Sequence, residues 1–136
     1  MDGSINRMFG YVFGATYVLV GLVGFAVTGG VDFAASQGKD LIFFGVNPLH
    51  NLVHIAVGAL LLIGAAGGLA RARAVNGLVG ATYLLVAVLG FVIVDSAANI
   101  LALNHPDNVL HLISAAVALV VANKGDRAAR AVRAAD

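Results

Sequence analysis

The amino-acid sequence predicts an all-α membrane protein, a bundle of four transmembrane helices that forms a single domain over residues 1–136. Three observations predict this fold: the composition, the lengths of the apolar segments and a repeat in their pattern. Of the 136 residues, 60% are hydrophobic and only 11% are charged, far from the balance of soluble proteins. The mean hydropathy of +0.95 agrees. Cysteine is absent, which excludes disulfides and thiolate metal ligands.

Four apolar segments are each long enough to cross a bilayer. We place them at about residues 8–28, 47–70, 75–94 and 106–122. Segments of about 17 to 24 residues are about 25 to 36 Å long as helices, enough for a hydrocarbon core of about 30 Å. Because four segments cannot close a barrel, only helices can satisfy their backbone hydrogen bonds in lipid.

The first and third segments carry the same run of small residues. Residues 14–17 and residues 80–83 both read Gly-Ala-Thr-Tyr, 66 positions apart. Further glycines follow at helical spacing along both segments, and such stripes let a neighbouring helix backbone come close in a membrane. We therefore expect these two helices to pack through their glycines.

The second and fourth segments begin with a shared polar pattern: an asparagine, a second asparagine four positions on, and a histidine three positions later. The residues are Asn47, Asn51 and His54 in one copy and Asn104, Asn108 and His111 in the other. At these spacings the side chains share one helix face. Together with the glycine runs, the pattern predicts a tandem repeat of a two-helix unit, with a pseudo-two-fold axis along the membrane normal.

The basic residues predict the orientation of the chain in the cell membrane. Seven of the eight lie before the first segment, between the second and third, or after the fourth: Arg7, Arg71, Arg73, Lys124, Arg127, Arg130 and Arg133. Because basic residues favour the cytoplasmic side, we expect a multi-pass protein with both termini in the cytoplasm. Residues 69–76 then form a short cytoplasmic link and residues 123–136 a basic cytoplasmic tail. The connection over residues 29–46 is an outer loop.

Histidine inside a membrane helix is costly and therefore suggests a function. His54 and His111 occupy equivalent positions in the two polar patterns, so we expect their rings to share one site near the outer leaflet. As a pair they are candidate axial ligands of a haem. The other possibility is a transition-metal site, for which the candidate ligands are His50, His54, His105, His111 and Asp107.

A simpler interpretation of the same residues needs no cofactor. In this interpretation the polar cluster of Asn47, Asn51, Asn104 and Asn108 joins the helices by hydrogen bonds, in a setting where lipid provides no hydrophobic drive. The sequence favours it over haem or a transition metal because no recognisable cofactor motif accompanies the histidines.

No catalytic residues are predicted. The chain has no phosphate-binding glycine loop and no zinc-protease His-Glu-x-x-His motif, and no nucleophile can be placed with a base and an orienting acid. We therefore expect a non-catalytic structural or accessory membrane component, not an enzyme. Its expected partners are the lipid bilayer and either further copies of itself or an unidentified membrane complex, but not nucleic acid. The alternatives are a haem- or metal-binding redox protein and a subunit of a small-solute or proton transporter.

Two motifs also suggest a family. The runs FGVNPLHNLVH, from Phe44 to His54, and DNVLHL, from Asp107 to Leu112, give the chain a clear resemblance. It resembles a family of small four-helix bacterial membrane proteins known as a domain of unknown function, over about residues 7–122. The resemblance implies an integral membrane protein and brings no activity, ligand or partner with it.

Overall fold

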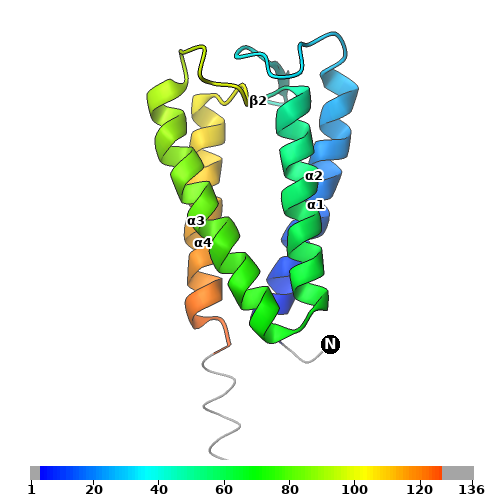
Figure 1. Ribbon diagram of the computed structural model, residues 1–136, viewed down its shortest axis with the longest axis vertical. Helices are drawn as coiled ribbons and strands as arrows, with labels where there is room; N and C mark the ends of the chain where they lie inside the picture. Colours follow the sequence, from blue (N-terminus) through cyan, green and yellow to red (C-terminus); the bar gives the residue numbers. More distant parts are fainter. Residues whose placement is uncertain (1–3, 127–136) are drawn as a thin grey trace, which may run out of the picture.

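The computed structural model describes residues 4–126 as four long helices with a small hairpin at one end (Figure 1). The helices are α1 (Ile5–Val27), α2 (Pro48–Ala66), α3 (Leu69–Ile93) and α4 (His105–Lys124), and the strands are β1 (Lys39–Leu41) and β2 (Phe44–Val46). Within this described part, all four helices are long and apolar enough to cross a membrane. The prediction of an all-α protein with four such helices is confirmed. Most of the predicted basic tail, from residue 127 on, lies outside the described residues.

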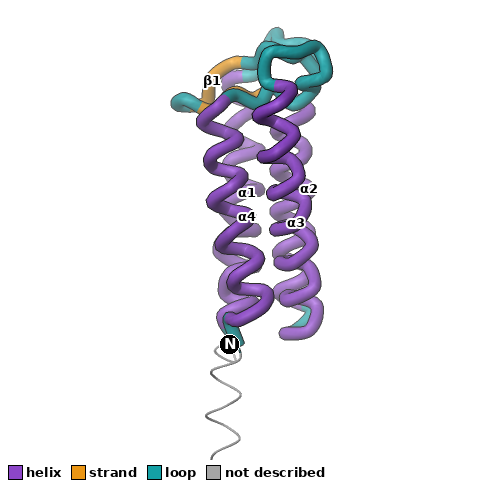
Figure 2. The backbone as a smooth tube through the Cα atoms, turned by 90° about the vertical axis from the view of Figure 1, so that its left-hand side faces the viewer, coloured by secondary structure: helices purple, strands orange, loops and turns teal. Residues whose placement is uncertain are grey.

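The helices associate as two close pairs, α1 with α2 and α3 with α4 (Figure 2). Glycines make this approach possible. A Cβ atom added at Gly14 would lie 2.8 Å from the carbonyl oxygen of Gly58 and 2.9 Å from the Leu62 side chain. One added at Gly80 would lie 2.9 Å from the Leu119 side chain. Because no side chain fits there, the α1–α2 backbones come as close as glycine permits.

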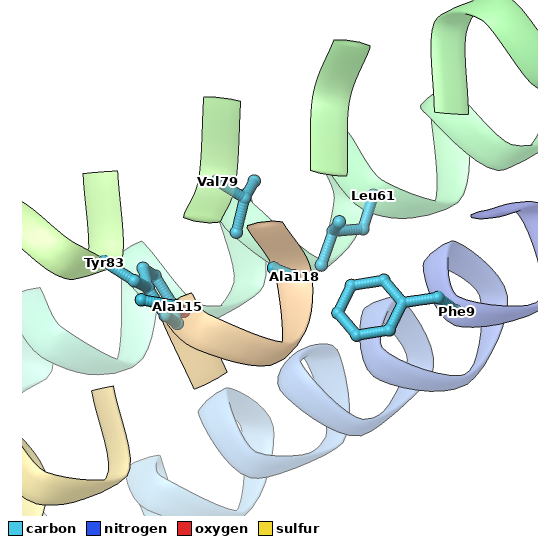
Figure 3. Packing of buried hydrophobic residues seen from close by; sticks show 6 residues of the cluster. All are labelled: Phe9, Leu61, Val79, Tyr83, Ala115 and Ala118. Atoms are coloured by element: carbon cyan, nitrogen blue, oxygen red, sulfur yellow. The ribbon is translucent and has the colours of Figure 1, made fainter. Parts of the chain in front are cut away.

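A small apolar core joins the two pairs (Figure 3). Its buried members come from all four helices: Phe9, Leu61, Val79, Tyr83, Ala115 and Ala118. Large apolar side chains such as Leu19 and Val92 are exposed, at 61% and 78%. In a soluble protein such an exterior would favour aggregation, whereas in a bilayer it faces acyl chains. The core is therefore narrow, and the apolar outer surface is suited to contact with a lipid bilayer.

The link expected over residues 69–76 is instead the first part of α3. The true connection between α2 and α3 is only Gly67 and Gly68, and Gly68 has a φ of 95°, which favours glycine. Arg71 and Arg73 lower the local hydropathy, which made the segment resemble a loop. Arginine is nevertheless a good helix former, so the predicted start of this helix was six residues too late. The other three helices begin and end within a few residues of the predicted positions.

A buried polar cluster ties the helices together at the end where α1 begins and α4 ends. The Asn6 side-chain amide donates to Oδ2 of Asp126 at 2.6 Å. The Asn76 amide donates to Oδ1 of Asn6 at 3.0 Å. Asp126 also accepts the backbone N–H of Ile5 at 2.9 Å, which is one of the free donors at the start of α1. This carboxylate therefore joins the two ends of the described chain, a contact that no sequence motif predicts.

The Asp126 contacts predict a pH-dependent stability. Burial raises the pKa of Asp126, but hydrogen bonds from Asn6 and Ile5 lower it more, so that the pKa lies below the ordinary value. A lowered carboxyl pKa stabilises the fold above about pH 4, and this stabilisation is lost as the pH falls through the folded-state pKa. We expect Asp126→Asn to lower the thermal midpoint at pH 7, with a difference that narrows toward pH 3. The exposed Asp95 supplies the control, Asp95→Asn, and an equal deficit at both pH values would contradict the assignment.

The connection over residues 29–46, expected as a loop, contains a β-hairpin as well. β1 and β2 pair antiparallel, with a two-residue turn at Ile42 and Phe43. Ile42 has a φ of 66°, which hairpin turns of this length require at the first central position but which is strained for a β-branched residue. It is 82% exposed. The hairpin was missed because neither turn position carries the glycine or asparagine that normally marks such a turn.

Candidate metal-binding site

Three buried histidines meet between α2 and α4. His50 and His54 lie one turn apart on α2, and His111 comes from α4. The ring centroids of His50 and His54 are 4.5 Å apart, and those of His54 and His111 are 6.4 Å apart. One ring nitrogen of each histidine lies within 4.8 Å of the other two. The structure thus brings together three of the five residues predicted as metal ligands.

Each of the three rings carries a nitrogen that is buried and unpaired. Among the described residues, Nε2 of His50, Nδ1 of His54 and Nδ1 of His111 have no hydrogen-bond partner. The side chains are only 1%, 9% and 6% exposed. A buried polar atom without a partner typically destabilises a fold by about 1 to 3 kcal/mol, and three together call for an explanation.

A backbone contact sets the tautomer of His50. Its Nδ1 lies 3.0 Å from the carbonyl oxygen of Gly45. Since a carbonyl can only accept, Nδ1 carries the proton and donates, which leaves Nε2 with a free lone pair. Metal-binding histidines are commonly oriented in this way through their second nitrogen.

Asp107 supports His50 from behind this contact. The backbone N–H of Gly45 donates to Oδ2 of Asp107 at 2.9 Å, so a single peptide residue connects the carboxylate to the imidazole. The same oxygen accepts the backbone N–H of Asn104 at 3.0 Å, and the Asn104 side chain in turn accepts the Asp107 N–H. This reciprocal arrangement is a capping box at the start of α4. Asp107, predicted as a ligand, therefore serves as an indirect support for His50.

Two of the four predicted cluster asparagines are helix caps. Oδ1 of Asn47 accepts the backbone N–H of His50 at 2.8 Å, and its amide donates to the carbonyls of Ala35 and Ile100. The amide of Asn104 donates to the carbonyl of Phe43 at 2.9 Å. These side chains satisfy orphan groups at the helix starts and hold the loops at the hairpin end against the bundle.

The other two asparagines, Asn51 and Asn108, lie fully buried against glycines. Asn51 faces Gly24 and donates its amide to the Thr28 hydroxyl at 3.0 Å, and Asn108 faces Gly90. Within residues 4–126, the four predicted asparagines are joined to one another only by backbone hydrogen bonds inside each helix, Asn51 to Asn47 and Asn108 to Asn104, and by none between side chains. The direct side-chain network between helices, which the simpler interpretation required, is therefore not formed. Caps, loop carbonyls and Thr28 occupy three of the four amides, and the Asn108 amide has no hydrogen-bond partner among the described residues.

His105 lies apart from the three-histidine cluster. It is the first residue of α4 and is exposed. Its ring packs on Phe91, with ring centroids 6.2 Å apart. Six positions separate it from His111, a spacing that places the two on different faces of the helix. It therefore offers a matched control for the clustered histidines.

A comparison with family models covers most of the chain, with a match over residues 7–123 to a domain of unknown function, DUF4383. The chain belongs to the DUF4383 family. This confirms the resemblance drawn from the two histidine motifs. Comparisons with curated proteins and with solved structures give no match.

In this DUF4383 protein, two tyrosines and a cavity complete the surroundings of the histidines. The Tyr17 ring packs on His54 with centroids 5.6 Å apart, and the Tyr83 ring packs on His111 at 4.9 Å. A cavity of about 250 Å³ borders His54, His111 and Asp107 on the side of α1 and the hairpin. Sequence reasoning missed the cavity and the role of Gly45. The contacts of the two tyrosines with the histidines could have been predicted, because both tyrosines end a repeated Gly-Ala-Thr-Tyr run.

Proposed function

We propose that this protein is an integral membrane protein that binds one transition-metal ion through His50, His54 and His111. The observation that carries the proposal is the group of three buried histidines, one ring nitrogen of each within 4.8 Å of the other two, in which every ring also has a buried nitrogen without a hydrogen-bond partner. It favours the metal-binding alternative over the purely structural role that the sequence alone favoured. A bound ion would supply the partner that all three nitrogens lack.

The donor set points to an ion such as Zn²⁺ or Cu²⁺. Imidazole nitrogens suit zinc, copper, iron and nickel, and three histidines with one open position are a known zinc arrangement. Nitrogens bound at about 2.1 Å to one tetrahedral ion lie about 3.4 Å apart, so nitrogens that lie up to 4.8 Å apart need to approach one another by at most about 1.4 Å. Because all three imidazoles are neutral ligands, a dication would carry its charge into the bundle. The nearby Asp107 carboxylate would offset part of it.

The arrangement supports a bare ion over a haem. A haem leaves two axial positions on opposite faces of a planar ring. Here the third histidine, His50, lies within 4.5 Å of His54, centroid to centroid. The macrocycle would have to pass through the space that this third ring occupies.

Metal analysis of the purified protein tests the proposal. We expect about one ion per chain after loading with Zn²⁺ and removal of excess, and no visible haem band. His50→Ala should lose the ion, because only its Nε2 is pre-oriented by Gly45. His105→Ala, on an exposed histidine, should retain it. An ion-free parent protein, or equal metal contents for the two variants, would refute a three-histidine site.

We further propose that the bundle is a tandem repeat with a pseudo-two-fold axis along the membrane normal. Matching contacts support it. Nε of Arg7 donates to the carbonyl of Ala65 at 2.9 Å, and Nε of Arg73 donates to that of Ala122 at 3.0 Å. The two arginines are 66 positions apart and the two alanines 57, the same offsets that align the two halves of the sequence.

Our proposed topology places both termini in the cytoplasm and the hairpin outside the cell membrane. The start of α1, the α2–α3 turn and the end of α4 lie at one end of the bundle, opposite the hairpin (Figure 1), and seven of eight basic residues belong to that end or its tails. A reporter inserted at Gln37 should be active outside and one inserted at Gly68 inside. Activity on the same side for both insertions would reject this topology.

A further inference from the structure

The cavity beside the histidines has a polar floor and an apolar mouth. His54, His111 and Ser114 line it and are buried. Ile42 and Leu110 also line it but are 82% and 42% exposed. The cavity therefore runs from the outer surface of the helices inward to the imidazoles of His54 and His111.

The mouth faces the bilayer. The cavity walls come from α1, α4, the hairpin and His54 of α2. α1 and α4 belong to different helix pairs and contact each other far less than their own partners, so the cavity lies along the seam between the pairs. Figure 2 shows the hairpin above the side of the bundle where α1 and α4 lie. A molecule dissolved in the outer leaflet can reach the floor along this seam without crossing water.

The size and the walls of the cavity select an aromatic occupant. A cavity of about 150 Å³ is enough for benzene, so this one, at about 250 Å³, accommodates a single substituted ring. Phe13, Tyr17 and Phe44 contribute aromatic walls, next to the imidazoles of His54 and His111. Rings stack edge-to-face or offset on such walls, which adds to the gain from burial.

We propose that this cavity binds an aromatic head group bearing a carbonyl or hydroxyl oxygen, of the quinone or phenol class, which enters from the bilayer. The ring occupies the aromatic walls and the oxygen meets the floor at His54 and His111. The inference rests on the proposed function in one respect: the oxygen takes the open position of the ion that the three histidines hold. The imidazoles of His54 and His111, which line the cavity, supply the polar end in either case.

Ligand binding to the detergent-purified full chain tests the proposal, with duroquinone as the probe. Durene has the same methylated ring without oxygens, and decanol has an oxygen without a ring. We expect duroquinone to bind the Zn²⁺-loaded protein at least about tenfold more tightly than either analogue. Durene has no oxygen to make the hydrogen bond or metal contact at the floor, and decanol has no ring to stack on the aromatic walls. Equal binding of durene would exclude a role for the oxygen, and equal binding of decanol would exclude the aromatic class.

A variant pair places the site on the structure. Leu110→Trp fills the mouth and should abolish duroquinone binding while the Zn²⁺ content is unchanged. Val117→Trp, at a similarly exposed residue of α4 (40%) away from this cavity, should leave both unchanged. A Zn²⁺-loaded protein that fails to bind duroquinone overturns this inference and leaves the metal site standing. A different outcome is that the protein holds no Zn²⁺ and still binds duroquinone more tightly than both analogues, with Leu110→Trp abolishing that binding. This result would refute the metal function and support the aromatic site.

Discussion

Replacing Gly14 with leucine is expected to disrupt the bundle. A Cβ at this position already lies 2.8 Å from the carbonyl oxygen of Gly58 and 3.1 Å from the backbone nitrogen of Leu62. Neither backbone atom can rotate away, so α1 and α2 would have to separate along their length. Overpacking costs about 1 to 3 kcal/mol where side chains can adjust, and we expect about 3 kcal/mol or more here. Loss of helical signal during denaturation in mixed micelles measures the change.

The neighbouring alanine provides a control for this substitution. Ala15 is exposed, and Ala15→Leu adds the same atoms to a surface that faces lipid. We expect it to leave stability nearly unchanged. Gly80→Leu should be harmful but milder than Gly14→Leu, because its closest contact is the movable Leu119 side chain, at 2.9 Å. Equal tolerance of leucine at positions 14 and 15 would mean that the α1–α2 contact is not close in the membrane.

Bound metal should couple His54 to His111. If both hold one ion, either His54→Ala or His111→Ala removes the whole stabilisation by the ion, which is about 2.7 kcal/mol at a free ion concentration 100 times the Kd. The double variant should then be little worse than either single variant. The destabilisation of the double variant should therefore be smaller than the sum of the two single effects. In Zn²⁺ this difference should approach about 2.7 kcal/mol, and in excess chelator it should shrink. Thermal unfolding of the four proteins, with and without Zn²⁺, measures this coupling.

Independent histidines would behave differently in the same experiment. Their effects would add, and neither variant would respond to chelator. His105→Ala should match the parent protein under both conditions, because its ring packs on Phe91 outside the cluster. Strict additivity in Zn²⁺ would leave His54 and His111 as two separate buried polar residues.

Much of the site could be predicted from sequence wherever a single helix decides it. His50 and His54 lie four positions apart on one continuous helix, so their approach follows from helical geometry. The approach of His111 followed from the repeated pattern of asparagines and histidine. The cap of α2 also follows from local sequence, since Asn47 directly precedes Pro48 and its side chain then reaches the first free N–H groups.

Other parts of the site depended on segments distant in the chain. Asp107 and His50 are linked through Gly45 of β2. The hairpin that contains this strand lacks the glycine or asparagine turn by which it could have been recognised in the sequence. The Asn6–Asp126 bond spans almost the whole chain. Such contacts depend on where loops and helix ends meet, which hydropathy and periodicity do not encode.

The sequence by itself determined the four helices and the glycine stripes of the first and third. That these glycines pack α1 against α2 and α3 against α4, and not α1 against α3, was decided by the tertiary structure. Apolar length and glycine spacing are properties of a continuous segment, and a bilayer leaves such a segment little choice but a helix. Only the tertiary structure decided which polar residues are used by caps and which remain unpaired. An asparagine or histidine has several possible partners, and the nearest free N–H or carbonyl in space takes it. For that reason Asn104 and Asp107 pair with each other in a cap, while three imidazole nitrogens are left together without partners beside an apolar cavity.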